Sequence, residues 1–279
     1  MNGRRAIILL AALMLGLGCD RADYSPQRLR AEHALLAKQD MAFIKRGRDF
    51  GYYDVTVISD RGDTLHCNYR VPAGVLNRKL KALLWLYDSP DTVDMSVLDG
   101  TAAGRVTAVL GCNLHDAFER DGSGAVKSGK SNAMSGLLDT RRRVDLLLQL
   151  LRKHQVNDSL QIFVGGEGLA AVAAIPALAG QSKRHAGIAL ADLSGGQALA
   201  EQWTEFEFAQ AATWSGELRG HVALFDDQDP GIAFAQSPQR WPLSGTSLES
   251  VVRWVAGGDT LASQVPVDTT FSRVVKVES

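Results

Sequence analysis

A glycine- and lysine-rich segment contains the most explicit chemical motif in the sequence. Residues 124–131 fit the pattern G-x-x-x-x-G-K-S, with Gly124, Gly129, Lys130 and Ser131 at its fixed positions. In a phosphate-binding loop of this form, backbone N–H groups and the lysine hold nucleotide phosphates, and the serine holds Mg²⁺. Such a loop begins directly after a buried strand, whereas the residues before Gly124 are polar and charged. Nucleotide binding is therefore the third of three functional hypotheses for this chain. For this segment we expect an exposed, mobile surface loop instead.

The N-terminus carries the pattern of an export signal. Two arginines precede an unbroken apolar run at residues 6–17, which is short for a membrane span. Gly18 and Cys19 follow it, and the sequence LGLGC resembles the lipobox of bacterial lipoproteins. Gly16 departs from that pattern, in which leucine is usual at this position. The resemblance implies that cleavage makes Cys19 the new N-terminus and that its sulfur carries a lipid.

The lipobox resemblance also predicts a location. In lipoproteins of enterobacterial type, an aspartate after the cysteine favours the inner membrane, and Asp20 stands there. We therefore expect an exported protein in a bacterial periplasm, anchored to the inner membrane, with the outer membrane as the alternative. The expected organisation is a signal peptide at residues 1–18, an anchored N-terminal helix and linker at 19–48, and one folded domain at 49–279.

The composition is that of an ordinary globular domain. The chain is 46% hydrophobic and 22% charged, and its net charge of −1 leaves no basic surface for nucleic acid. No second apolar run is long enough to cross a bilayer. The predicted partners are a membrane, reached through Cys19, and a small molecule or protein of unknown identity. We predict no cofactor and no metal.

Two cysteines remain once Cys19 is set aside. In an oxidising compartment, Cys67 and Cys112 predict a disulfide. The alternative interpretation is two buried thiols that are not bonded to each other.

Hydrophobic patterns predict the elements that must position these residues. Ser25 and Pro26 predict the start of a helix whose apolar positions continue to about residue 46. A hairpin is expected next, followed by buried strands that alternate with helices. The hairpin strands are at 52–59 and 64–71, the later strands at 81–87, 105–111, 159–164, 185–191 and 221–225, and the main helices at 138–154, 168–178 and 248–255. This order predicts an α/β fold with a mostly parallel central sheet, helices on both faces and an N-terminal antiparallel hairpin.

The order of elements resembles the α/β-hydrolase superfamily over about residues 51–257. The resemblance is carried by LLDTRRRVDLLLQLLRKHQVNDSLQIFVGGEGLAAVAAIPALAG, in which a helix leads to a strand that ends in a glycine-rich turn. In that family the turn has the form Gly-x-Ser-x-Gly, and its serine is the nucleophile. The later segment VALFDDQDP resembles the strand that delivers the catalytic acid, with Asp229 as the best match and Asp226 or Asp227 as the alternatives. The family strand order also implies that the strands of Cys67 and Cys112 are neighbours.

The catalytic positions depart from the family pattern. Glu167 stands at the nucleophile position, or that position is deleted between Gly166 and Glu167, and the turn contains no serine. The family base should follow Asp229, but no histidine lies beyond His221. An acyl-transfer triad needs a base within hydrogen-bond reach of its nucleophile. The sequence therefore predicts a catalytically inactive domain that binds a small ligand or a protein partner, with Glu167 either touching that ligand or facing solvent.

The alternative hypothesis is an active esterase with relocated catalytic residues. Ser194, in ADLSGGQALA, lies between a strand and a helix, where it is either a nucleophile or a helix N-cap. Ser89, which follows the strand KALLWLY, could use His115 as its base.

Overall fold

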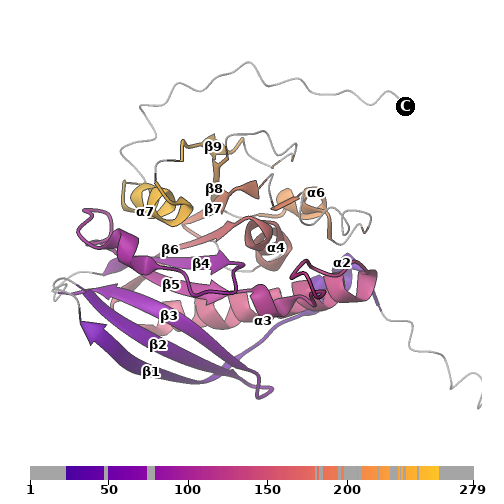
Figure 1. The fold of residues 1–279 in the computed structure, drawn as a ribbon, viewed down its shortest axis with the longest axis horizontal. Helices are drawn as coiled ribbons and strands as arrows, with labels where there is room; N and C mark the ends of the chain where they lie inside the picture. The colour runs from indigo at the N-terminus through magenta and orange to yellow at the C-terminus, as the bar shows by residue number, and fades with distance from the viewer. Residues whose placement is uncertain are drawn as a thin grey trace, which may run out of the picture.

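A computed structural model describes most of the chain between residues 23 and 257, and its residues form one nine-stranded mixed sheet (Figure 1). The described residues are 23–46, 50–73, 79–179, 181, 185–193, 196–197, 206, 209–218, 220–226, 232, 234, 237–243 and 245–257. Cys19 and the predicted signal peptide therefore lie outside them. Within the described part, no helix has the length and hydrophobicity needed to cross a membrane.

The strand order is β1-β2-β3-β5-β4-β6-β7-β8-β9. The strands are β1 (Leu36–Arg46), β2 (Phe50–Ser59), β3 (Thr64–Pro72), β4 (Leu80–Tyr87), β5 (Thr107–Asn113), β6 (Asn157–Glu167), β7 (Gly187–Ala191), β8 (His221–Phe225) and β9 (Gln239–Arg240). The pairs β1–β2, β2–β3 and β3–β5 are antiparallel, and the strands from β5 to β9 pair in parallel. The predicted fold class is therefore confirmed.

Helices cover both faces of the sheet (Figure 1). They are α2 (Pro26–Ala31), α3 (Lys130–Lys153), α4 (Leu169–Leu178), α6 (Ala211–Ser215) and α7 (Ser247–Gly257), with short 3₁₀ turns η1 (Met95–Leu98) and η2 (His115–Ala117). Alternate residues of β4 point to opposite faces, so Leu84 packs in the cluster with α3 and α4, whereas Trp85 packs in the cluster with α7 and η1. Both faces are buried, which explains why the β4 sequence is an unbroken apolar run.

The helix predicted up to about residue 46 is much shorter in the structure. Ser25 caps α2 as predicted, because its side chain accepts a hydrogen bond from the N–H of Arg28, but the helix ends at Ala31. Residues 36–46 form the edge strand β1, inside the segment that the sequence assigned to a helix and linker. Phe43 and Ile44 are 57% and 52% exposed there, so two of the apolar residues used to predict a packed helix face are not buried.

Cys67 and Cys112 come together, but as free thiols. The register pairs Asn68 of β3 with Gly111 of β5, which puts the two cysteines opposite each other one position further along. Hydrogen bonding to Cys112, together with burial, raises the pKa of the Cys67 thiol. The predicted disulfide is therefore absent from the structure. Opposite residues of antiparallel strands have Cβ atoms about 4.5–5.5 Å apart, mostly wider than the roughly 3.5–4.5 Å of a disulfide.

Arg141 joins three helices on the α3 side of the sheet. Its guanidinium is fully buried and donates to backbone carbonyls of Glu32, Pro176 and Ala179. Because Glu32 ends α2 and the other two acceptors lie at the end of α4, this one side chain fixes both helices against α3. A buried cation satisfied in this way would be costly to truncate, because the carbonyls would lose their donors.

The pH dependence of stability should include a contribution from His185. This residue lies just before β7 and is 3% exposed, and burial, assisted by the charge of Arg152, lowers its pKa from 6.5 to about 4. Between those values the unfolded chain binds the proton and the folded protein does not, so the free energy of unfolding should fall as the pH falls. The loss expected across this window is about 2–3 kcal/mol.

Urea unfolding at about pH 7 and about pH 5 checks this contribution. His185→Gln should flatten the pH dependence, whatever its effect on stability at neutral pH. If the free energy of unfolding of the variant depends on pH as strongly as that of wild type, His185 does not titrate on unfolding.

Candidate active site

Polar side chains gather at the carboxyl ends of the parallel strands. The register aligns the last residues of β4, β5, β6, β7 and β8 in one row across the sheet. The side chains at or just beyond this row belong to Asp88, Ser89, Asn113, His115, Glu167, Asp192 and Asp226. In α/β sheets, ligands bind outside the carboxyl ends of the strands. This edge is therefore the candidate site.

The turn from β6 into α4 has the sharp geometry that the sequence predicts. Gly168, the N-cap of α4, has φ +57° and ψ −129°, a conformation that L side chains rarely adopt. Gly166 lets the helix approach closely, because a Cβ added there would lie 3.0 Å from the Cα of Ala171. The strained residue is thus Gly168, one position beyond Glu167, to which the sequence assigned the tip of the turn. The tip therefore carries no side chain.

Glu167 is held by a residue from the other end of the fold. Its carboxylate accepts a hydrogen bond of 2.6 Å from the hydroxyl of Ser247, the first residue of α7. The side chain of Glu167 is half-buried at the end of β6. Asp192 flanks the turn from β7, and its Oδ2 would lie 3.8 Å from a Cβ built on Gly168. Asp192 itself has φ +46°, a strained backbone of the kind that clusters at functional sites.

A carboxylate–imidazole pair lies at the ends of β4 and β5. Asp88 Oδ1 is 3.1 Å from His115 Nδ1, and the histidine side chain is 34% exposed. The amide of Asn113 ties the two loops together, because its oxygen accepts from the His115 N–H and its nitrogen donates to the Ser89 carbonyl. Arg120 also donates to Asp88 and holds that carboxylate in place. A histidine bonded through one ring nitrogen to a carboxylate keeps the other nitrogen for proton transfer.

Ser89 follows Asp88 directly on the same loop. Its side chain is half-buried, and its hydroxyl oxygen accepts a hydrogen bond of 3.2 Å from the Asp91 N–H. Ser89 and His115, which the sequence named as an alternative pair, are thus on neighbouring strand ends. Sequence reasoning missed Asp88, although its position directly after the buried run of β4 was a usable signal.

Two other predicted site residues, Ser194 and Asp229, lie outside the described residues. The glycine–lysine segment does not follow a strand directly, because β5 ends at Asn113 and a small hairpin with an Arg120–Val126 bridge precedes Gly129. Helix α3 begins at Lys130, not near residue 138 as predicted. No strand leads into Gly124, so the structural requirement of a nucleotide-binding loop is not met.

No protein-family model and no curated protein sequence matches the chain. Solved structures match its fold. The acetyl xylan esterase 1 of Thermoanaerobacterium sp. JW/SL YS485 has a TM-score of 0.56 and 14% identity, covering 84% of this chain and 91% of that one. The acetyl xylan esterase of Paenibacillus sp. R4 also has a TM-score of 0.56 and 14% identity, covering 82% of this chain and 91% of its own. The chain therefore has the α/β-hydrolase fold.

The interpretation of the domain as catalytically inactive is wrong. That interpretation rested on the absence of a serine and a histidine from the positions that the family motif assigns to them. The fold, however, is shared over most of the chain with solved structures of esterases. The alternative of a hydrolase with relocated residues is better supported. Its physical basis is that carboxylate and imidazole groups still meet at the strand ends although the usual turn has lost its serine.

The strain at Gly168 can be measured. Gly168→Ala should lower the free energy of unfolding by about 1–3 kcal/mol, because alanine resists this backbone conformation although space for a Cβ exists. Gly216→Ala is the matched control, since Gly216 has φ −70° and nothing within 4 Å of an added Cβ. That change should be neutral or slightly stabilising. Equal effects of the two substitutions in chemical denaturation would show that the turn is not strained.

Proposed function

We propose that the protein is an ester hydrolase with relocated catalytic residues at the carboxyl ends of β4 and β5. The observation that carries this proposal is the Asp88–His115 pair, 3.1 Å apart, with Ser89 directly after Asp88 in the chain. A base oriented by a carboxylate next to a serine is the arrangement that activates a hydroxyl nucleophile. The α/β-hydrolase fold supports the proposal, because its sheet positions these groups where substrates bind in such folds.

Each residue has a defined part in the proposed reaction. Asp88 accepts the Nδ1–H of His115, so the Nε2 of His115 takes the proton from the Ser89 hydroxyl. The serine oxygen attacks the ester carbonyl carbon, and the alcohol leaves with the proton returned by His115. Water, deprotonated by the same imidazole, then releases the acid from Ser89. Backbone N–H groups at the strand ends are the natural donors to the developing oxyanion.

Ser247 is the second candidate nucleophile, because its hydroxyl donates to Glu167 at 2.6 Å. A carboxylate is ordinarily a weaker base than an imidazole near neutral pH, so it activates a hydroxyl less well. Ser89 therefore has the stronger chemical case. In this proposal Glu167 holds the start of α7 against the turn at Gly168.

The kinetic prediction concerns His115 and Ser89. With a generic acyl ester such as p-nitrophenyl acetate, His115→Gln should lower kcat/KM by about 100-fold or more, because the general base is lost. Ser89→Ala should have a comparable effect. His221→Gln is the matched control, since His221 is exposed at the first residue of β8, on the opposite edge of the sheet from the carboxyl ends of the strands. Retention of wild-type kcat/KM by either site variant, or equal loss in the control, would contradict the assignment.

We also propose that the protein is exported and anchored to a membrane through a lipid on Cys19, in a bacterial periplasm. The lipobox-like sequence LGLGC and the basic start with its apolar run support this. The anchored N-terminal segment would hold the hydrolase domain close to the bilayer, with a small ester as its substrate. Asp20 favours the inner membrane over the outer.

Phase partition tests the anchor. The mature protein should enter the detergent phase, and Cys19→Ser should release it into the aqueous phase or block processing. A Cys19→Ala protein that is cleaved normally, with a wild-type product found only in the aqueous phase, would identify an ordinary secretory signal.

A further inference from the structure

Arg120 connects three segments of the chain beside the Asp88–His115 pair. Its Nη2 donates to Asp88 Oδ1, its Nε donates to the His115 carbonyl at 3.1 Å, and its Nη1 donates to the Gly124 carbonyl at 2.9 Å. The side chain is only 17% exposed. His115 Nδ1 faces the same oxygen of Asp88, so the guanidinium and the imidazole share one acceptor. Because a guanidinium presents its N–H groups in a rigid plane, these contacts fix the position of that oxygen.

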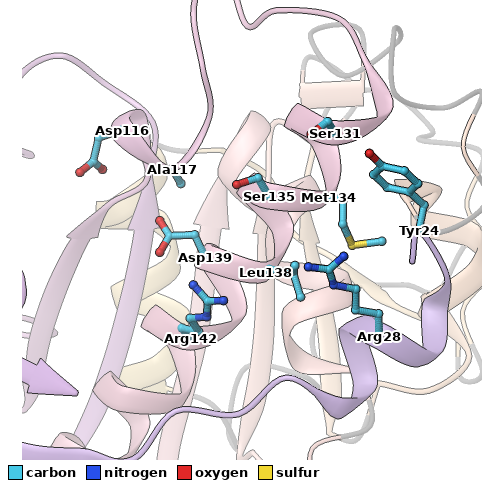
Figure 2. Close-up of a pocket in the computed structure, with 10 residues that line it drawn as sticks. All are labelled: Tyr24, Arg28, Asp116, Ala117, Ser131, Met134, Ser135, Leu138, Asp139 and Arg142. Atoms are coloured by element: carbon cyan, nitrogen blue, oxygen red, sulfur yellow. The ribbon is translucent and has the colours of Figure 1, made fainter. Parts of the chain in front are cut away.

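A second arginine near the site, Arg143, does not duplicate this contact. It donates to the Asn113 carbonyl at 2.9 Å and pairs with Asp116 and Asp139, each at 2.7 Å. Those two aspartates lie together at one end of a pocket of about 500 Å³ between α2, η2 and α3 (Figure 2). The charge of Arg143 is therefore directed toward the pocket, whereas Arg120 serves the carboxylate of the proposed site.

Arg120 belongs to a hairpin at residues 119–127 that is fastened to the start of α3. Asn132, in the first turn of α3, is 9% exposed. Its amide oxygen accepts from the Glu119 N–H at 2.8 Å, and its amide nitrogen donates to the carbonyls of Glu119 and Lys127 at 3.1 Å and 2.8 Å. One buried side chain therefore holds both ends of the hairpin, which gives Arg120 a fixed base.

The tip of the hairpin uses the first glycine of the glycine–lysine motif. Gly124 has φ +85°, and its N–H donates to the Asp121 carbonyl at 3.0 Å. The Asp121 carboxylate in turn accepts from the N–H groups of Ser123 and Ala125 at 2.8 Å and 3.1 Å. This turn places the Gly124 carbonyl where it accepts from Arg120. The glycine that resembles part of a phosphate-binding loop thus shapes the turn that supports Arg120.

We propose that Arg120 is a positioning residue for the Asp88–His115 pair and that the hairpin holds it in place. This inference rests on the proposed hydrolase function and gives the glycine–lysine segment a part in that site. Arg120 acts through Asp88, because it keeps Oδ1 opposite the imidazole and so keeps the Nε2 of His115 directed for proton transfer. Without it the pair would be misaligned during the reaction while the substrate still binds, so kcat should fall and KM should change little.

Steady-state kinetics with p-nitrophenyl acetate test the role of Arg120. Arg120→Met should lower kcat by about tenfold or more and change KM by less than about twofold. Arg120→Lys keeps a charge beside Asp88 but not the planar fork, so it should recover part of the lost kcat. Arg30→Met is the matched control, because Arg30 is a half-buried arginine that pairs with Glu217 instead of a group at the site. Wild-type kcat in Arg120→Met, a change confined to KM, no recovery in Arg120→Lys, or an equal loss in Arg30→Met would overturn the proposal.

Gly124→Ala tests the hairpin without changing Arg120. Alanine resists φ +85°, so the turn should shift and its carbonyl should move away from the guanidinium. The value of kcat should then fall by about threefold or more. Gly122→Ala is the matched control, because Gly122 is exposed in the same turn, does not have a positive φ and has nothing within 4 Å of an added Cβ. Equal kcat in the two glycine variants would overturn the part given to the hairpin.

Crystal structures of the wild type and of Arg120→Met provide a readout that needs no turnover. The separation of Asp88 Oδ1 and His115 Nδ1 should stay near 3.1 Å in the wild type and should exceed about 3.5 Å in the variant. An unchanged separation in the variant would overturn the positioning role. If the wild type shows no esterase activity but the variant loses this contact, the hydrolase proposal fails and the positioning role of Arg120 stands. The two failures are therefore distinguishable.

Discussion

The close packing around Trp85 is the constraint on which the centre of the fold depends. This side chain is fully buried in β4, and its register partners on the two neighbouring strands are both glycines, Gly111 and Gly165. A Cβ on Gly165 would lie 2.9 Å from the indole ring. On the opposite face, Gly166 gives α4 the room it needs beside β6. The large indole ring occupies the space that side chains at the two glycine positions would need, so the core is filled without voids, as in other close-packed protein interiors.

This packing fixes where chemistry can occur. Because α4 is pressed against β6, the chain must turn sharply at the end of the strand, and Gly168 accepts the resulting strain. In α/β-hydrolases a serine stands on such a turn. Here the strained position has no side chain, and the acid–imidazole pair at the strand ends comes from β4 and β5. We therefore place the reaction on the same edge of the sheet, at the ends of β4 and β5, which lie one and two strands from β6.

The sequence predicts the central sheet well because buried strands have a strong signal. The apolar runs of β4 and β5 leave little choice of structure, and alternation with helical patterns implies parallel pairing. The prediction from sequence fails at β1, because Leu36, Phe43 and Ile44 fit the period of a helix as easily as that of a strand. Only the pairing with β2 favours the strand.

At the site, the sequence identifies the turn but not the residue at its strained tip. Without a serine in the turn, the sequence gives no reason to place Gly168 there instead of Glu167. Asp88 and His115 are 27 residues apart and meet only because β4 and β5 are neighbours, so their pairing needs the strand order. The hydrogen bond of Ser247 to Glu167 spans 80 residues and has no sequence signature.

Labelling with a fluorophosphonate, followed by peptide mapping, tests the central claim most directly. The reagent forms a covalent bond only with a serine whose hydroxyl has been activated by a base. We expect stoichiometric labelling of Ser89 that disappears in His115→Gln. Labelling of a different serine, Ser247 or Ser194 among them, would contradict the role given to the Asp88–His115 pair, and absence of any labelled serine would contradict serine-based ester hydrolysis altogether.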